Sequence, residues 1–262
     1  MRRGLARSRE QASAFILDGQ VSVAGMPATK PATGVTTDQA IVVSATGAES
    51  YASRGAHKLL GALHAFIPAG LRVADRRCLD AGASTGGFTD VLLRSGAREV
   101  VAVDVGYGQL VWELRNDERV MVLDRTNVRD LTVELIGGPV DLVTGDLSFI
   151  SLTLVLPALT TVCGADADLV LMVKPQFEVG KERLGRGGVV REPELRSEAV
   201  LTVATAAGAL GWGTGGVAPS PLPGPSGNVE YFVWLRRDAQ PVTRNMVEEA
   251  VAQGPTGEKV TR

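Results

Sequence analysis

The sequence predicts an α/β fold with a seven-stranded, mostly parallel sheet. From residue 77 onward, short apolar runs alternate with helix-like segments. This alternation is typical of parallel strands joined by helices that cover both faces of one sheet. One or two of the runs are equally readable as buried helix. The seven runs lie at Cys78, 100–103, 120–123, 140–143, 169–173, 214–218 and 231–235.

The composition excludes several classes of protein. The chain has 262 residues, 45% of them hydrophobic, which suffices for a medium domain and a small one. Two cysteines in different settings give no disulfide framework, and with only two histidines we expect no metal site. No signal peptide is visible, and the apolar stretch 152–173 is interrupted by Pro157, Asp166 and Asp168. We therefore expect a cytoplasmic monomer without membrane insertion.

Residues 1–47 are basic and predict a small α+β unit. Arginines crowd the start of a short helix, and an alternating segment with a Gly25-Met26-Pro27 turn follows. Exposed arginines and lysines contact phosphates and set affinity without reading sequence, although a plain solvated helix face is the alternative. The unit resembles the S4 RNA-binding domain, and because the chain begins inside that motif, its first helix is expected to be missing. The RNA contacts expected here are Arg2, Arg3, Arg7, Arg9 and Lys30.

Three further segments complete the predicted organisation. Residues 48–57 are polar and form an interdomain linker, in which Arg54 is a further candidate RNA contact. Residues 58–238 form the large domain. Residues 239–262 are expected to be a disordered tail.

The stretch Cys78–Asp90 predicts a strand, a glycine-rich turn and a helix start, so that backbone N–H groups can approach a ligand. Its spacing matches neither the Gly-x-Gly-x-x-Gly of dinucleotide folds nor a P-loop. The carboxylate of Asp80 would repel a pyrophosphate but suits an ammonium or sulfonium group. The alternative is an ordinary strand-turn-helix.

Asp104 follows the next apolar run, where a doubly wound sheet places the acid that binds ribose hydroxyls. Together the two acids and the glycines resemble the S-adenosyl-L-methionine site of class I, Rossmann-like methyltransferases. The resemblance implies that Gly82–Phe88 wraps the methionine end, Asp104 binds the ribose and Asp124 binds the adenine amino group. The cofactor-binding residues implied are Asp80, Gly82, Ser84, Thr85, Gly86, Gly87, Phe88, Asp104, Asp124 and Asp146.

Lys174 directly follows a buried apolar run. Partial desolvation favours the neutral amine of a lysine, which can then act as a general base, whereas the alternative is a snorkelling lysine at a strand end. The segment that begins at Asp146 lacks the Pro-Pro-aromatic motif of amino-methylating enzymes, and no Pro-Cys nucleophile occurs. Oxygen is therefore the expected methyl acceptor.

Lys58, Asp146, Lys174 and Glu230 match, in order and context, the Lys-Asp-Lys-Glu tetrad of FtsJ-like ribose 2′-O-methyltransferases. With the S4-like segment, residues 1 to about 237 resemble the TlyA family, which methylates ribosomal RNA and is also named hemolysin. The long motifs 173–178 and 221–228 carry the resemblance. The linker 49–52 departs from it, because it lacks the arginine and tryptophan that members can carry there.

The resemblance implies 2′-O-methylation of a cytidine ribose in 16S or 23S ribosomal RNA within ribosomal subunits. Lys174 would be the base or would steer the hydroxyl, Asp146 would align Lys174, and Lys58 with Glu230 would position the ribose. Further RNA contacts implied on the large domain are Arg125, Arg129 and Lys181; Arg125 is equally readable as a salt-bridge partner. Two alternatives stay open: a non-catalytic RNA-binding or assembly factor, and a membrane-active hemolysin.

Overall fold

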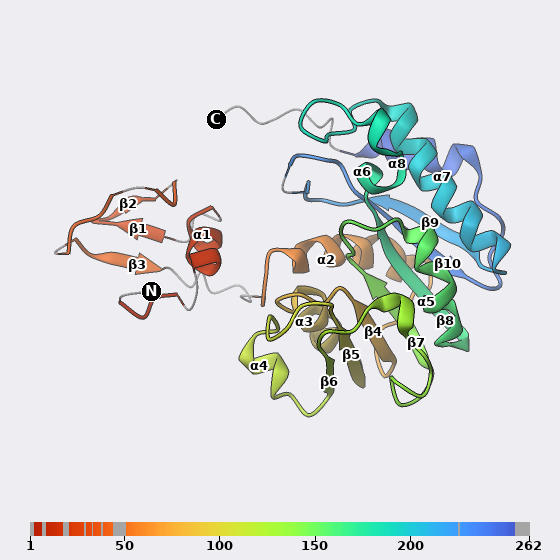
Figure 1. Cartoon of the computed structure of the whole chain (residues 1–262), viewed down its shortest axis with the longest axis horizontal. Helices are drawn as coiled ribbons and strands as arrows, with labels where there is room; N and C mark the ends of the chain where they lie inside the picture. The colour runs from red at the N-terminus through yellow and green to blue at the C-terminus, as the bar shows by residue number, and fades with distance from the viewer. Residues whose placement is uncertain are drawn as a thin grey trace. The chain divides into compact units, whose positions relative to one another are not determined.

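The chain divides into two compact units, residues 1–54 and 55–262, so the division falls inside the predicted linker (Figure 1). The computed structural model describes residues 3–6, 9–17, 21–28, 30–32, 34–37, 39–43, 51–224 and 226–254. The smaller unit contains α1 (Arg9–Leu17), β1 (Val21–Val23), β2 (Met26–Pro27) and β3 (Ile41–Val43).

A three-stranded antiparallel sheet of order β2-β1-β3 organises the smaller unit. The turn between β1 and β2 has positive φ at Ala24 (49°) and Gly25 (81°), as the glycine at this point of the sequence suggests. The predicted helix and hairpin are therefore present. The strand β3 was not predicted.

The larger unit holds a seven-stranded sheet of order β6-β5-β4-β7-β8-β10-β9. Neighbours from β6 to β8 are parallel, and β10 is antiparallel to both β8 and β9, which confirms the prediction of a mostly parallel sheet. The strands are β4 (Arg77–Ala81), β5 (Glu99–Val103), β6 (Val120–Leu123), β7 (Val140–Gly145), β8 (Cys163–Val173), β9 (Gly213–Pro219) and β10 (Tyr231–Arg236). The helices are α2 (Gly55–Phe66), η1 (Ile67–Ala69), α3 (Gly87–Arg94), α4 (Trp112–Arg115), η2 (Val128–Asp130), η3 (Leu152–Leu154), α5 (Leu156–Thr161), α6 (Pro175–Glu178), η4 (Lys181–Arg183), α7 (Pro193–Ala209) and α8 (Arg244–Gln253).

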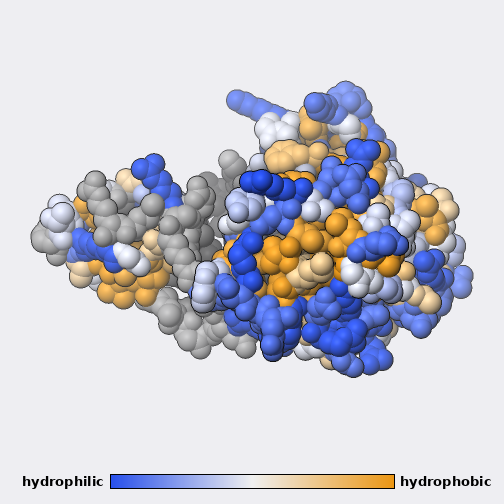
Figure 2. Space-filling model, turned by 60° about the horizontal axis from the view of Figure 1, so that its bottom comes forward, coloured by the Kyte–Doolittle hydropathy of each residue, from blue (hydrophilic) through white to orange (hydrophobic). Residues whose placement is uncertain are grey.

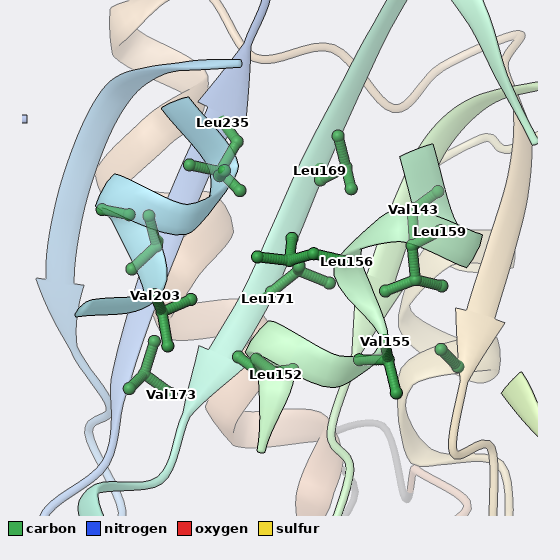
Figure 3. Packing of buried hydrophobic residues seen from close by; sticks show 14 of the residues in the cluster. Val143, Leu152, Val155, Leu156, Leu159, Leu169, Leu171, Val173, Val203 and Leu235 are labelled. Atoms are coloured by element: carbon green, nitrogen blue, oxygen red, sulfur yellow. The ribbon is translucent and has the colours of Figure 1, made fainter. Parts of the chain in front are cut away.

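Successive side chains of each strand point to opposite faces of the sheet, and helices cover both faces. On one face Leu169, Leu171 and Val173 of β8 pack in a cluster with residues of α5 and α7 (Figure 3). On the other face α2 and α3 pack against each other and the sheet, with the Phe66 and Trp234 ring centroids 5.7 Å apart. The strands whose ends form the site are thus held by packing on both faces of the sheet.

The expectation of disorder beyond Asp238 is wrong for residues 239–254, because this segment contains the helix α8. Thr243 caps α8 by accepting a hydrogen bond from the Met246 N–H, and Val247, Ala250 and Val251 are buried. Thr243 and the spacing of these three residues are a helix signal that the composition of the tail obscured. Residues 255–262 lie outside the described residues.

Candidate active site

Four of the predicted site residues converge at one edge of the seven-stranded sheet, because parallel strands end at the same edge. Asp146 follows β7 and Lys174 follows β8. The antiparallel strand β10 pairs Tyr231 with Val173, so Glu230 enters the same edge from the opposite direction. Lys58 lies in the first turn of α2.

The four side chains form a chain of alternating charge. Lys58 Nζ lies 2.6 Å from Glu230 Oε2 and 3.8 Å from Asp146 Oδ2, while Lys174 Nζ lies 2.6 Å from Asp146 Oδ1. The last contact is an ion pair whose angles fall outside the range of a hydrogen bond. The Glu230 side chain is 1% exposed and that of Asp146 is 21% exposed. Such buried charges are tolerated when they pair with one another.

Two contacts extend this tetrad beyond the prediction. Lys174 Nζ donates a hydrogen bond to Ser148 Oγ at 2.8 Å, and Lys58 Nζ lies 3.9 Å from Met172 Sδ. A serine three residues after a strand carries no signal of its own in the sequence. Ser148 is therefore a site residue that sequence reasoning missed.

The loop between β9 and β10 packs closely against α2 at Gly61 and, through its own Gly224, against Glu230. A Cβ on Gly61, one helical turn after Lys58, would lie 2.6 Å from Pro221 Cδ. A Cβ on Gly224 would lie 2.5 Å from Glu230 Oε1. Both positions require glycine for close approach, so the loop is packed between α2 and the buried carboxylate.

Asp80 is a buried carboxylate at the end of β4. Its Oδ2 accepts a hydrogen bond from Thr89 Oγ1 at 2.7 Å, and among the described residues its Oδ1 has no hydrogen-bond partner. Burial raises the pKa of Asp80 to about 7; the bonds from Thr89 oppose the rise, and the charges of Asp146 and Asp104 add to it. An unpaired buried oxygen of this kind suits a cationic ligand.

The glycine loop after β4 closes on the loop after β5. Gly82 and Gly86 have φ of 86° and 102°, and Asp104 accepts hydrogen bonds from the N–H groups of Ser84 (2.8 Å) and Gly106 (2.7 Å). Thr85 O accepts from Val111 N, Gly87 begins α3, and the buried ring of Phe88 packs near Phe232. The predicted cofactor residues 80–88 and Asp104 are thus contiguous in space.

Asp124 differs from its predicted setting. Its Oδ2 lies 2.7 Å from Arg115 Nη2 and accepts a weaker hydrogen bond from Gly108 N at 3.3 Å. Arg115 was not part of the predicted site. The carboxylate is therefore already paired in the structure.

Comparison with known proteins identifies the family. Residues 51–237 match the FtsJ-like methyltransferases. Over 260 residues the chain is 58% identical to the 16S/23S rRNA (cytidine-2′-O)-methyltransferase TlyA of Mycobacterium tuberculosis, covering 97% of this chain and 96% of that protein. The chain is an FtsJ-like methyltransferase of the TlyA family.

Two further TlyA-like proteins carry the name hemolysin. Hemolysin A of Brachyspira hyodysenteriae is 36% identical over 231 residues, 87% of this chain and 94% of that protein. A solved structure of a candidate hemolysin from Streptococcus thermophilus has a TM-score of 0.78 at 38% identity, covering 96% of this chain and 92% of that one. In the part of the TlyA-family chain that the structure describes, no helix is long and apolar enough to cross a membrane.

The site residues fit S-adenosylmethionine, the cofactor of FtsJ-like methyltransferases. The unpaired Oδ1 of Asp80 can accept from the amino group of the methionine end. At Gly82 a Cβ would lie 3.0 Å from Asp146 O, so glycine at this position lets the loop after β4 approach the loop after β7 closely. No group of three potential metal ligands occurs among the described residues.

The predicted RNA contacts of this TlyA-family chain fall into three groups. Arg2 and Arg7 lie outside the described residues. The guanidinium of Arg3 donates to the carbonyl oxygens of Thr36, Thr37 and Gln39, so it holds a loop of its own unit. The remaining residues are exposed: Arg9, Lys30, Arg54, Arg125, Arg129 and Lys181.

Arg125 contacts an aromatic ring. Its guanidinium lies 4.3 Å from the centroid of the exposed Tyr107 ring, a cation–π arrangement. Within the described residues it makes no ion pair. The salt-bridge alternative therefore has no support here.

Proposed function

We propose that this protein transfers a methyl group from S-adenosylmethionine to the 2′-oxygen of a cytidine ribose in ribosomal RNA. The observation that carries the proposal is the alternating chain Glu230, Lys58, Asp146 and Lys174 at the sheet edge, beside the unpaired Asp80 in the glycine loop. The name of the relative at 58% identity supplies cytidine and ribosomal RNA as the substrate. We further propose that the RNA is recognised within ribosomal subunits by a monomer in the cytoplasm.

A ribose hydroxyl is a weak nucleophile, so the site must remove its proton and align its oxygen. The bound cofactor supplies a methyl group on a positively charged sulfur. Lys174 either accepts the hydroxyl proton or steers the hydroxyl through a hydrogen bond. Asp146, the most exposed of the four side chains, aligns Lys174 and lies nearest to where the reacting atoms meet.

Lys58 and Glu230 support Asp146 and Lys174 without contacting Lys174 themselves in the proposed mechanism. Glu230 is almost completely buried and holds Lys58 at 2.6 Å, which places a second ammonium 3.8 Å from Asp146. Asp146 thus lies between two lysine ammonium groups, so a change at either lysine alters the charge that faces the other. Lys58 thereby positions the ribose and offsets the charge of Asp146.

The smaller unit is proposed to be an S4-like RNA-binding domain. Arg9 at the start of α1 and Lys30 in the segment after β2 are exposed to solvent, where they can contact phosphates. On the larger unit, Arg129 and Lys181 are proposed to do the same. These contacts position the RNA, while the tetrad carries the chemistry.

The proposal is tested by tritiated methyl transfer to unmodified ribosomal subunits, with Lys174→Ala alongside. We expect alkali-resistant incorporation by the wild type and none by Lys174→Ala. Arg98→Ala is the matched control, because Arg98 precedes β5 at the opposite edge of the sheet. Cofactor binding by calorimetry without any transfer by the wild type would favour a non-catalytic RNA-binding role instead.

A further inference from the structure

We propose that Ser148 is a positioning residue that aims Lys174 at the reacting hydroxyl, and that Glu178 holds the loop carrying Ser148. This inference rests on the proposed function, because it assigns Lys174 to the reaction. Neither residue belongs to the tetrad.

The first argument is the geometry of the Lys174 ammonium. Its Nζ has two partners in the described structure, Asp146 Oδ1 at 2.6 Å and Ser148 Oγ at 2.8 Å. The contact with Asp146 is an ion pair outside hydrogen-bond angles, so it holds the ammonium without setting the direction of an N–H bond. The hydrogen bond to Ser148 fixes the rotation about the Cε–Nζ bond, and with it the directions of the other two N–H bonds. Ser148 thus removes the rotation that Asp146 alone leaves.

The second argument is that burial does not hold the tip of the loop after β7, although Leu147 and Ile150 on either side of the tip pack partly against the core. Ser148 is exposed, and Phe149 beside it is 91% exposed with a φ of 64°, a conformation that a bulky residue rarely adopts. The Phe149 ring packs against the Phe177 ring, with the two ring centroids 5.3 Å apart. Figure 2 shows apolar areas on a surface that is otherwise rich in hydrophilic residues. The exposed tip is therefore fixed by polar contacts in addition to the packing of its neighbours.

Glu178 supplies those anchors. Its Oε2 accepts a hydrogen bond from Ser151 Oγ at 2.6 Å, and its Oε1 accepts one from Leu152 N at 2.9 Å. Glu178 lies at the end of α6, which begins directly after Lys174. The loop after β7 is thus tied to the segment after β8 at two points, by Lys174 at Ser148 and by Glu178 at Ser151.

The bonds of Glu178 to Ser151 and Leu152 are not needed to hold the tetrad in place. Asp146 is already fixed by its own N–H, which donates to Ala81 O at 3.1 Å. Residues 147–150 span the gap between that anchor and Glu178. The packing of Leu147 and Ile150 and the two bonds of Glu178 together hold this span. Glu178 therefore contributes to the position of Ser148 Oγ, and the direction of Lys174 depends on Ser148.

The test compares methyl transfer by Ser148→Ala, Ser148→Thr, Glu178→Ala and the Ser148→Ala/Glu178→Ala double variant. We expect Ser148→Ala to lower kcat about tenfold with KM for RNA and cofactor affinity unchanged, the loss expected for one hydrogen bond to a charged group. Ser148→Thr, which keeps the hydroxyl, should restore most of kcat. Ser95→Ala, at the end of α3, is the serine control.

The double variant separates positioning from general stability. If Glu178 acts through Ser148, the kcat losses of the two single variants do not add in the double variant, whereas independent roles give a product of the two losses. Additive losses, or a Ser148→Ala enzyme with wild-type kcat, would overturn the inference. Lys174→Ala is run in the same series. An active Lys174→Ala enzyme would overturn the role of Lys174 and, with it, this inference. Absence of methyl transfer by the wild type would overturn the proposed function itself, whereas an active wild type and an inactive Lys174→Ala enzyme beside a fully active Ser148→Ala enzyme would overturn only this inference.

Discussion

The tetrad and the cofactor loop lie at the same sheet edge, and both contain buried charge, but they compensate it differently. Glu230 and Asp146 each have a lysine nitrogen at 2.6 Å. One carboxylate oxygen of Asp80 accepts a hydrogen bond from the Thr89 hydroxyl, and within the described chain the other oxygen has no hydrogen-bond partner. The charges of the tetrad are therefore already paired within the protein, whereas the loop keeps a carboxylate with one oxygen open to a ligand.

The largest effect should come from breaking the compensation in the tetrad. Lys58→Met leaves Glu230 buried without its cation, so we expect the free energy of unfolding to fall by about 3–5 kcal/mol, measured by chemical denaturation. The Lys58→Met/Glu230→Gln variant should regain most of that loss but remain inactive. A single variant as stable as the wild type would show that Glu230 does not depend on Lys58.

In the cofactor loop the opposite result is expected, because removing the Asp80 charge should stabilise the chain. The pKa of Asp80 is about 7 in the folded state against an ordinary 3.8, so the folded state binds this proton more tightly. Stability is then lost as the pH rises from about 4 to about 7, and it stays low above that window. Without cofactor, Asp80→Asn should melt roughly 5–10 °C above the wild type at about pH 8 and close to it at about pH 4.

Asp124→Asn is the matched control for that experiment. Its carboxylate is paired with Arg115, so its substitution should not raise the melting temperature at either pH. An Asp80→Asn variant that melts below the wild type at about pH 8 would contradict the assignment of Asp80 as an uncompensated charge.

Gly224→Ala tests how closely the β9–β10 loop packs on the tetrad. The added Cβ would meet Glu230 Oε1 at 2.5 Å, so either the loop or the carboxylate must move. We expect a loss of about 1–3 kcal/mol in unfolding free energy together with lower kcat. Gly227→Ala, where the space is open but φ is 89°, controls for backbone strain alone. Equal activity of the two variants would mean that the contact with Glu230 is unimportant.

Cofactor affinity should depend on pH through Asp80. The amino group of the cofactor pairs with the ionised carboxylate, so protonation below about pH 7 opposes binding. We expect the Kd to rise by up to about tenfold for each pH unit below 7, measured by calorimetry. The affinity of Asp80→Asn should be weaker and independent of pH. A flat profile for the wild type would place the ammonium elsewhere.

The smallest effects should come from the exposed cations. Arg129→Ala should weaken RNA binding and reduce the slope of log affinity against log salt concentration by about 1. Arg3→Ala should leave that slope unchanged, because its guanidinium is bound to three carbonyl oxygens of its own unit. An equal change of slope for both would mean that Arg3 leaves those carbonyls to bind phosphate.

The strands and the tetrad were predictable from the sequence for the same physical reason. Every apolar run expected to be a strand is one. Short apolar runs between turn residues are typical of strands in a sheet covered by helices, and the inner strands β4, β7 and β10 are buried along most of their length. Parallel strands end at one edge, so Asp146 and Lys174 could be placed together without coordinates. Glu230 follows from the same argument once β10 is antiparallel.

What could not be predicted depends on contacts between loops. The bond of Lys174 to Ser148, the pairing of Asp124 with Arg115 and the packing of Gly61 on Pro221 each join segments whose path no periodicity specifies. The helix α8 was missed for another reason. Its glycine-rich and charged surroundings suggested disorder, and its buried side consists of only three residues.

The tetrad contains two cations and two anions, and its charges sum to zero. Electrostatic attraction over more than a few ångströms depends on net charge, so this cluster exerts little pull on a polyanion. Under the proposed function, attraction of RNA and chemistry on RNA therefore belong to different residues. Exchanging exposed arginines should then change which RNA surface is bound while the tetrad remains untouched.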